Sequence, residues 1–121
     1  MRTTNWYLAE LVKRTDFLRD PAIVYVDLVL IKAESDEAAY EKAMIAGRSR
    51  EVEYTNTDYE KVVIRFLGLR NLHHIYEEVE DGSELIFEEY DDLTEEEIAS
   101  LVKAKLDLSI FKATIVTGKS E

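Results

Sequence analysis

Apolar and polar residues alternate with a period of two in the first part of the chain, which predicts two β-strands. In residues 5–13 the even positions are apolar except for Glu10, and the odd positions from Tyr7 to Leu11 are apolar as well. Residues 22–33 are largely apolar on both sides, with Asp27 between them. A sheet with two apolar faces has to be covered twice, so we expect helices, a partner subunit or both to pack on it.

The spacing changes to that of a helix at Ser35, whose hydroxyl can cap free backbone N–H groups. Asp36 and Glu37 follow at the positive end of the helix dipole, and alanine and other apolar residues then recur at helical spacing. We expect Gly47 to end this helix, because glycine adopts the positive φ of a C-terminal cap without strain.

Three further strands and a second helix are predicted downstream. Residues 51–56 and 61–72 form a hairpin around a turn at residues 55–58, with a bulge or bend at Gly68. Asp81 and Gly82 mark another turn, and residues 84–90 alternate like a strand. Thr94 starts the last helix with a capping box closed by Glu97. The apolar stripe of that helix consists of Ile98, Leu101, Val102 and Leu106.

These elements predict an α+β fold in the order ββαβββα: a mainly antiparallel sheet of about five strands with both helices packed against it. A chain of 121 residues, 46% of them apolar and 34% charged, has the size and composition of one globular domain. We place this single α+β domain at residues 1–111 and a C-terminal tail at residues 112–121.

The negative charge of the chain is concentrated in one stretch. Twelve of the 26 acidic residues and none of the 15 Lys and Arg lie in residues 77–97, here called the acidic strip, so the rest of the chain is nearly neutral although the net charge is −11. Such a field attracts basic proteins and repels nucleic acid. The residues predicted to bind a basic partner are Glu77, Glu78, Glu80, Asp81, Glu88, Glu89, Asp91 and Asp92.

Several sequence features argue against other classes of protein. The chain has no cysteine, so we expect no disulfides and no thiolate chemistry. The longest apolar run is too short to span a bilayer, and the N-terminus has no signal-peptide pattern. We therefore expect a soluble, cytoplasmic protein that binds neither membranes nor nucleic acid.

No catalytic motif, cofactor motif or metal-ligand spacing stands out, so we predict no catalytic residues, no cofactor and no metal. His73 and His74 are neighbours on a predicted strand and point to opposite faces, which prevents joint chelation. The carboxylates near Glu88 lack the EF-hand spacing. An enzyme is less favoured but stays open; it would need a cleft that joins buried carboxylates to His73 or Arg65.

Aromatic residues on successive strands offer another candidate surface, either a pocket or the interface of a symmetric homodimer. They are Trp6, Tyr7, Tyr25 and Tyr54. We predict a symmetric homodimer, whose interface would cover the second apolar face of residues 22–33 unless the two helices cover opposite faces of the sheet.

Several segments taken together resemble a family of small bacterial proteins known only as a domain of unknown function. They are Trp6 with Tyr7, residues 29–35 and 37–43, the turn at residues 54–56, and residues 80–85. The resemblance covers residues 5–90, and residues from Leu93 onward lie outside it. It implies bacterial origin, a compact domain and no assigned activity, so no catalytic residues are carried over.

The leading functional hypothesis is a non-catalytic interaction module whose acidic strip docks on a basic protein. Immunity proteins against nuclease toxins and inhibitors that imitate nucleic acid are specific forms of it, since a negative strip competes for a surface built to hold phosphates. The alternatives are an acidic surface that only aids solubility, and a small-molecule-binding regulatory domain that uses the aromatic face of the sheet.

Overall fold

The computed structural model of the chain describes residues 4–111. The chain divides into two compact units, Met1–Phe87 and Glu88–Glu121, and each is described by itself. The predicted domain over residues 1–111 therefore includes parts of both units. The predicted tail, residues 112–121, lies outside the described residues.

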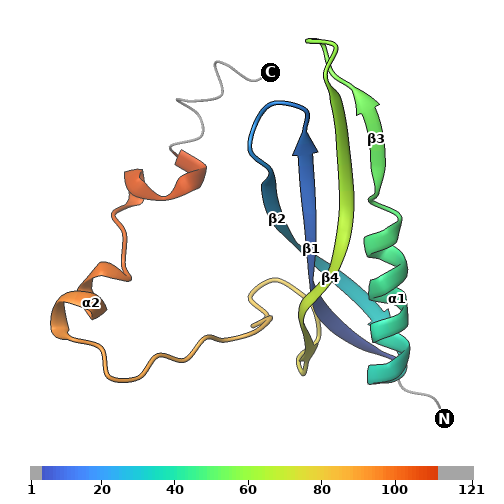
Figure 1. Cartoon of the computed structure of the whole chain (residues 1–121). Helices are drawn as coiled ribbons and strands as arrows, with labels where there is room; N and C mark the ends of the chain where they lie inside the picture. The colour runs from blue at the N-terminus through green and yellow to red at the C-terminus, as the bar shows by residue number, and fades with distance from the viewer. Residues whose placement is uncertain (1–3, 112–121) are drawn as a thin grey trace. The chain divides into compact units, whose positions relative to one another are not determined.

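The first unit is built on an antiparallel sheet of four strands (Figure 1). Along the chain these are β1 (Asn5–Phe17), β2 (Ile23–Ala33), β3 (Val52–Thr55) and β4 (Lys61–Ile75). Their order across the sheet is β2-β1-β4-β3, and every neighbouring pair is antiparallel. The α+β class and the antiparallel sheet are confirmed, with four strands rather than the predicted five.

The predicted strand over residues 84–90 is absent. This segment has no regular secondary structure, and Leu85 and Phe87 are 40% and 74% exposed. Alternation alone does not make a strand, because a strand is stable only where a neighbour satisfies its backbone groups. Residues 84–90 pair with no strand of the described chain, and their glutamates favour solvent over a sheet.

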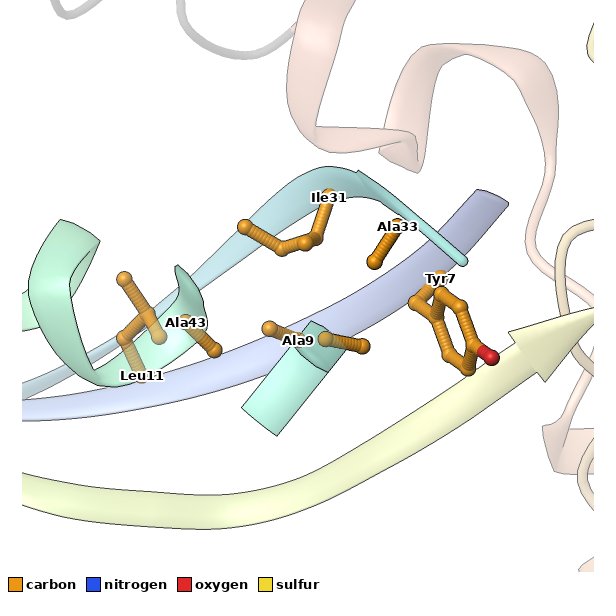
Figure 2. Close-up of a cluster of buried hydrophobic side chains, with 7 residues drawn as sticks. Tyr7, Ala9, Leu11, Ile31, Ala33 and Ala43 are labelled. Carbon is orange, nitrogen blue, oxygen red and sulfur yellow. The ribbon is translucent and has the colours of Figure 1, made fainter. Parts of the chain in front are cut away.

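Helix α1 (Asp36–Arg48) covers one face of the sheet. Ser35 caps it as predicted, since its Oγ accepts a hydrogen bond of 3.1 Å from the Ala38 N–H. The helix buries Ala39 and Ala43, whose small side chains permit a close approach to the sheet. Figure 2 shows the sheet residues of this core, which are Tyr7, Ala9 and Leu11 from β1 and Ile31 and Ala33 from β2.

Gly47 does not end the helix as predicted. The helix continues to Arg48, and its C-cap Ser49 has right-handed backbone angles. A Cβ added to Gly47 would lie 2.3 Å from a carbon of the Phe66 ring. The glycine is required because β4 packs closely against α1 at this point, not because the helix needs positive φ. The other predicted glycine feature is confirmed: Gly68 has a φ of 145° and lies at a register shift between β1 and β4.

The opposite face of the sheet is less well covered. The register places Leu8, Glu10 and Val12 of β1 on this face, and they pair with Leu30, Leu28 and Val26 of β2. Leu8 is buried, but Val24, Leu28 and Leu30 are 58%, 60% and 42% exposed. We call this surface the open face of the sheet.

In the second unit, helix α2 (Glu95–Ser100) is followed by a 3₁₀ turn, η1 (Lys105–Asp107). The predicted capping box is confirmed, because Thr94 and Glu97 exchange hydrogen bonds of 3.1 and 2.8 Å. The helix ends before Leu101, so the predicted stripe of four apolar residues is not on one helix. None of the residues of α2 is buried by the second unit itself.

Candidate functional site

A bulge in β4 brings two basic side chains to a buried carboxylate on the open face. Glu10 pairs with Asn71 and Leu11 pairs with Leu69, so Arg70 is the extra residue of the bulge. Arg70 Nε lies 2.6 Å from one oxygen of Glu10, and His73 Nε2 lies 2.6 Å from the other. Glu10 is only 7% exposed, and each of its two carboxylate oxygens has one hydrogen-bond partner.

These partners fix the charge of Glu10. The hydrogen bond from Arg70, followed by the one from His73, lowers the pKa of the Glu10 carboxyl below its ordinary value. An ionised carboxylate only accepts hydrogen bonds, so the Nε2 atom of His73 must carry the proton in this contact. Glu10 thus forms an ion pair with Arg70 and a hydrogen bond with His73.

His74 points to the other face, so the predicted opposition of the two histidines is confirmed. Its ring centroid lies 5.0 Å from that of Tyr7 and 4.2 Å from that of Tyr76. The Tyr7 hydroxyl donates a 2.8 Å hydrogen bond to Asp36 at the start of α1, and burial together with this bond raises the Tyr7 pKa. The Nε2 atom of His74 is buried and has no hydrogen-bond partner among the described residues.

After β4 the chain turns back on itself. Ser83 N–H donates a 3.0 Å hydrogen bond to the Glu80 carbonyl, and Gly82 has a φ of 90°, which confirms the predicted turn at Asp81 and Gly82. The turn brings the following residues beside the end of β4. Together they line a pocket of about 360 Å³, here called the His pocket. Its lining residues are His73, His74, Tyr76, Glu77, Glu84, Leu85, Ile86 and Phe87.

All twelve acidic residues of the acidic strip are exposed. None of them forms an ion pair with another residue of the described chain. Two accept hydrogen bonds: Glu88 from the Tyr90 hydroxyl at 2.7 Å, and Glu97 within the capping box. Of the eight predicted partner-binding residues, four lie in each unit. Glu77, Glu78, Glu80 and Asp81 follow β4, whereas Glu88, Glu89, Asp91 and Asp92 precede α2.

The four predicted aromatic residues do not share one surface. Tyr7 is 3% exposed in the core under α1, and Trp6 lies on the opposite face of β1. Tyr25 and Tyr54 are 47% and 48% exposed, on the two edge strands β2 and β3. Arg65, considered above as an enzyme residue, forms a 3.2 Å ion pair with Asp16 on the sheet, away from His73.

Sequence reasoning missed the contact between Glu10 and Arg70. One signal was available: a single glutamate on an apolar strand face is rarely buried without a partner. The sequence does not identify Arg70 as that partner, because Arg70 is 60 residues away in the chain and reaches Glu10 only through the bulge.

Two further classes of site are absent from residues 4–111. No group of three or more His, Asp or Glu side chains there is arranged to hold a metal ion. No helix in that part of the chain is long and apolar enough to cross a membrane.

Comparison with known proteins identifies one relationship. Residues 6–87 match the family described as Domain of unknown function (DUF4288). This region coincides with the first unit from Trp6 to Phe87. No curated protein and no solved structure matches the chain.

Proposed function

The chain belongs to the family described as Domain of unknown function (DUF4288), and we propose that it is a non-catalytic interaction module that docks on a basic protein through its acidic strip. The observation that carries this proposal is the exposure of twelve carboxylates without one ion pair among the described residues. Like charges held this close repel one another, and the basic groups of a partner would relieve that repulsion.

The residues that follow the strip support the same proposal. Apolar side chains of residues 98–111 are exposed; Val102, Leu106 and Ile110 are 81%, 74% and 74% exposed. In protein interfaces, charges set the rate and specificity of association, while buried apolar and aromatic groups supply most of the affinity. The partner surface is therefore expected to be basic beside an apolar patch. A surface built to hold phosphates, as in nuclease toxins or nucleic-acid-binding proteins, has the required charge.

The state of the buried carboxylates supports a non-catalytic role. A general acid needs a raised pKa, whereas the Glu10 pKa is lowered by Arg70 and His73. Glu60 is 6% exposed, and its oxygens accept hydrogen bonds from Arg19 N–H at 2.8 Å and Asn56 Nδ2 at 3.3 Å. Glu60 thus ties the turn after β1 to the turn before β4, which is a structural task.

Binding to a synthetic arginine-rich peptide at several salt concentrations tests the proposal. We expect affinity to fall steeply between about 50 and 500 mM salt, because screening shortens the reach of the field from more than 10 Å to a few. Changing four strip residues to their amides should slow association by about tenfold. The four are Glu88, Glu89, Asp91 and Asp92.

The matched control removes four charges elsewhere, from exposed residues of the first unit outside the strip. They are Asp20, Glu37, Glu41 and Asp58. The net charge changes equally, so this variant should bind the peptide nearly as well as the parent. Equal weakening by both variants would reduce the strip to part of a diffuse acidic surface and would contradict the proposal.

Self-association is a second proposal, favoured by the open face of the sheet. Its exposed Val24, Leu28 and Leu30 line one edge strand, and apolar surface of this kind is commonly covered in a symmetric dimer. Light scattering at tens of micromolar protein should give the mass of a dimer, and Leu28→Lys should give a monomer. A monomer mass for the parent chain would overturn this proposal.

A further inference from the structure

The His pocket combines two kinds of group that attract cations. Glu77 and Glu84 supply carboxylates, and Tyr76 and Phe87 supply aromatic rings that are 87% and 74% exposed. Exposed aromatic side chains beside carboxylates are the usual surroundings of a bound organic cation, because the ring face attracts the cation and the carboxylate neutralises it.

An unsatisfied atom also points to a ligand. The Nε2 atom of His74, which lines the pocket, is buried without a hydrogen-bond partner among the described residues. Nearly all buried polar atoms in proteins have such a partner. The Tyr76 ring meets the His74 ring edge-on at 4.2 Å, so a small movement of this exposed tyrosine would bring a ligand N–H group within reach of His74.

The size of the pocket restricts the classes of ligand that can fit it. A volume of about 360 Å³ is near the lower end of the range for small-molecule sites, which suits a side chain or a small amine better than a nucleotide. Anionic ligands are disfavoured by Glu77 and Glu84. A metal ion would need a set of oxygen ligands that residues 4–111 do not assemble.

We propose that the His pocket binds a guanidinium or alkylammonium group, supplied by an arginine or lysine side chain of the basic partner. This inference rests on the proposed function, because it assigns one anchoring contact to the docking surface. Arginine fits best: its planar head can stack on Tyr76 or Phe87 while donating to Glu77 or Glu84.

The chain has only two histidines, and their rings point to opposite faces of β4. The imidazole signals of His74 in an NMR spectrum therefore report occupancy of the pocket, and those of His73, whose ring contacts Glu10, serve as an internal reference. The probe is N-acetyl-arginine-N-methylamide, and the control is the citrulline analogue, which keeps the shape and loses the charge. We expect the arginine probe to shift the His74 signals saturably and the citrulline analogue to leave them unchanged. Equal shifts with both compounds would overturn the inference.

Paired variants separate a specific pocket from a general negative field. Glu77→Gln with Glu84→Gln removes two charges from the pocket, while Glu95→Gln with Glu96→Gln removes two from the strip outside it. We expect the first pair to weaken binding of the arginine probe at least tenfold and the second less than twofold. Tyr76→Ala should weaken binding severalfold, with Tyr40→Ala as the control at another exposed tyrosine. The inference would be overturned if the two double variants weakened binding equally, or if the two tyrosine variants did.

The same variants, tested with the arginine-rich peptide and with spermidine, separate the pocket from the proposed function. If binding of the peptide depends on Glu88, Glu89, Asp91 and Asp92 but not on Glu77 and Glu84, the docking proposal is supported and the pocket inference is overturned. If the arginine probe binds while the strip variant leaves peptide binding unchanged, the pocket stands and docking falls. Tighter binding of spermidine than of the peptide would support the cation site and overturn the partner side chain as its source.

Discussion

Both units of this protein contain many apolar residues, but among the described residues only the first unit packs them into a core of its own. Leu11 and Val62 of the first unit are fully buried, whereas Leu106 and Ile110 of the second are each 74% exposed. The first unit supplies two surfaces, a sheet and α1, which cover each other. The second supplies a helix of six residues, none of which its own unit buries, and helices this short are marginal in water. An apolar stripe thus becomes a core only where the chain also provides the opposing surface.

The difference between the two units agrees with the range of residues that the family matches. The match over residues 6–87 covers the unit that has a core and ends where the second unit begins. We therefore assign stability to the first unit and propose partner binding for the acidic strip and the residues after it.

Truncation of one leucine in each unit should show the largest contrast. Leu11→Ala is expected to cost about 2–5 kcal/mol of unfolding free energy, because it leaves a cavity between the sheet and α1. Leu106→Ala should change that free energy by less than about 0.5 kcal/mol. Urea denaturation followed by the fluorescence of Trp6, the only tryptophan, measures both. Similar losses of unfolding free energy for the two variants would contradict the proposed difference between the two units.

A carboxylate in each unit gives a second, smaller contrast. Glu10→Gln removes the ionised partner of Arg70 and His73 and is expected to cost about 1–3 kcal/mol. Glu89→Gln in the strip removes a charge that has no ion-pair partner among the described residues, so stability should stay the same or rise slightly. The same urea denaturation compares the two variants, and equal losses would mean that the Glu10 cluster adds nothing to the fold.

The lowered pKa of Glu10 also predicts how stability depends on pH. A carboxyl whose pKa is lower in the folded than in the unfolded state contributes stability above the ordinary value of 4.5, and that contribution is lost as the pH falls toward the folded pKa. Asp16, whose pKa is lowered by Arg14 and then Arg65, acts in the same direction. Glu10→Gln should therefore lose less stability than the parent chain below pH 4.5. Parallel pH profiles would contradict this assignment.

Helix caps should show the smallest contrast. Ser35→Ala removes a cap from a helix packed on the core and should cost about 1 kcal/mol of global stability. Thr94→Ala removes an equally formed cap from α2, and we expect no change in the urea midpoint because α2 buries nothing. A clear loss for Thr94→Ala would mean that the second unit contributes to cooperative folding.

The sequence predicted the features that depend on neighbours in the chain. Alternation located β1 and β2, Ser35 and Thr94 were identified as caps, and Gly68 and Gly82 marked the bulge and the turn. Each of these depends on a few consecutive residues, so local patterns were sufficient to find them.

Features that depend on distant contacts were missed or misread. Residues 84–90 alternate like a strand but pair with none, and Gly47 makes room for Phe66 rather than ending a helix. Arg70 reaches Glu10 only because a second bulge, distinct from the one at Gly68, adds one residue to β4. The His pocket likewise requires the turn at Gly82 to return the chain to the end of β4, a placement that no local pattern contains.

Hydrogen exchange of the full chain, alone and with the arginine-rich peptide, measures whether stability lies in the first unit and peptide binding in the acidic strip. In the free protein we expect amides of β1 and β4 to exchange about a hundredfold or more slowly than those of residues 88–111, because only the former lie in a packed sheet. The peptide should slow exchange in residues 77–97 and leave β1 unchanged. Protection of residues 88–111 equal to that of β1 in the free protein, or no effect of the peptide on the acidic strip, would contradict the account.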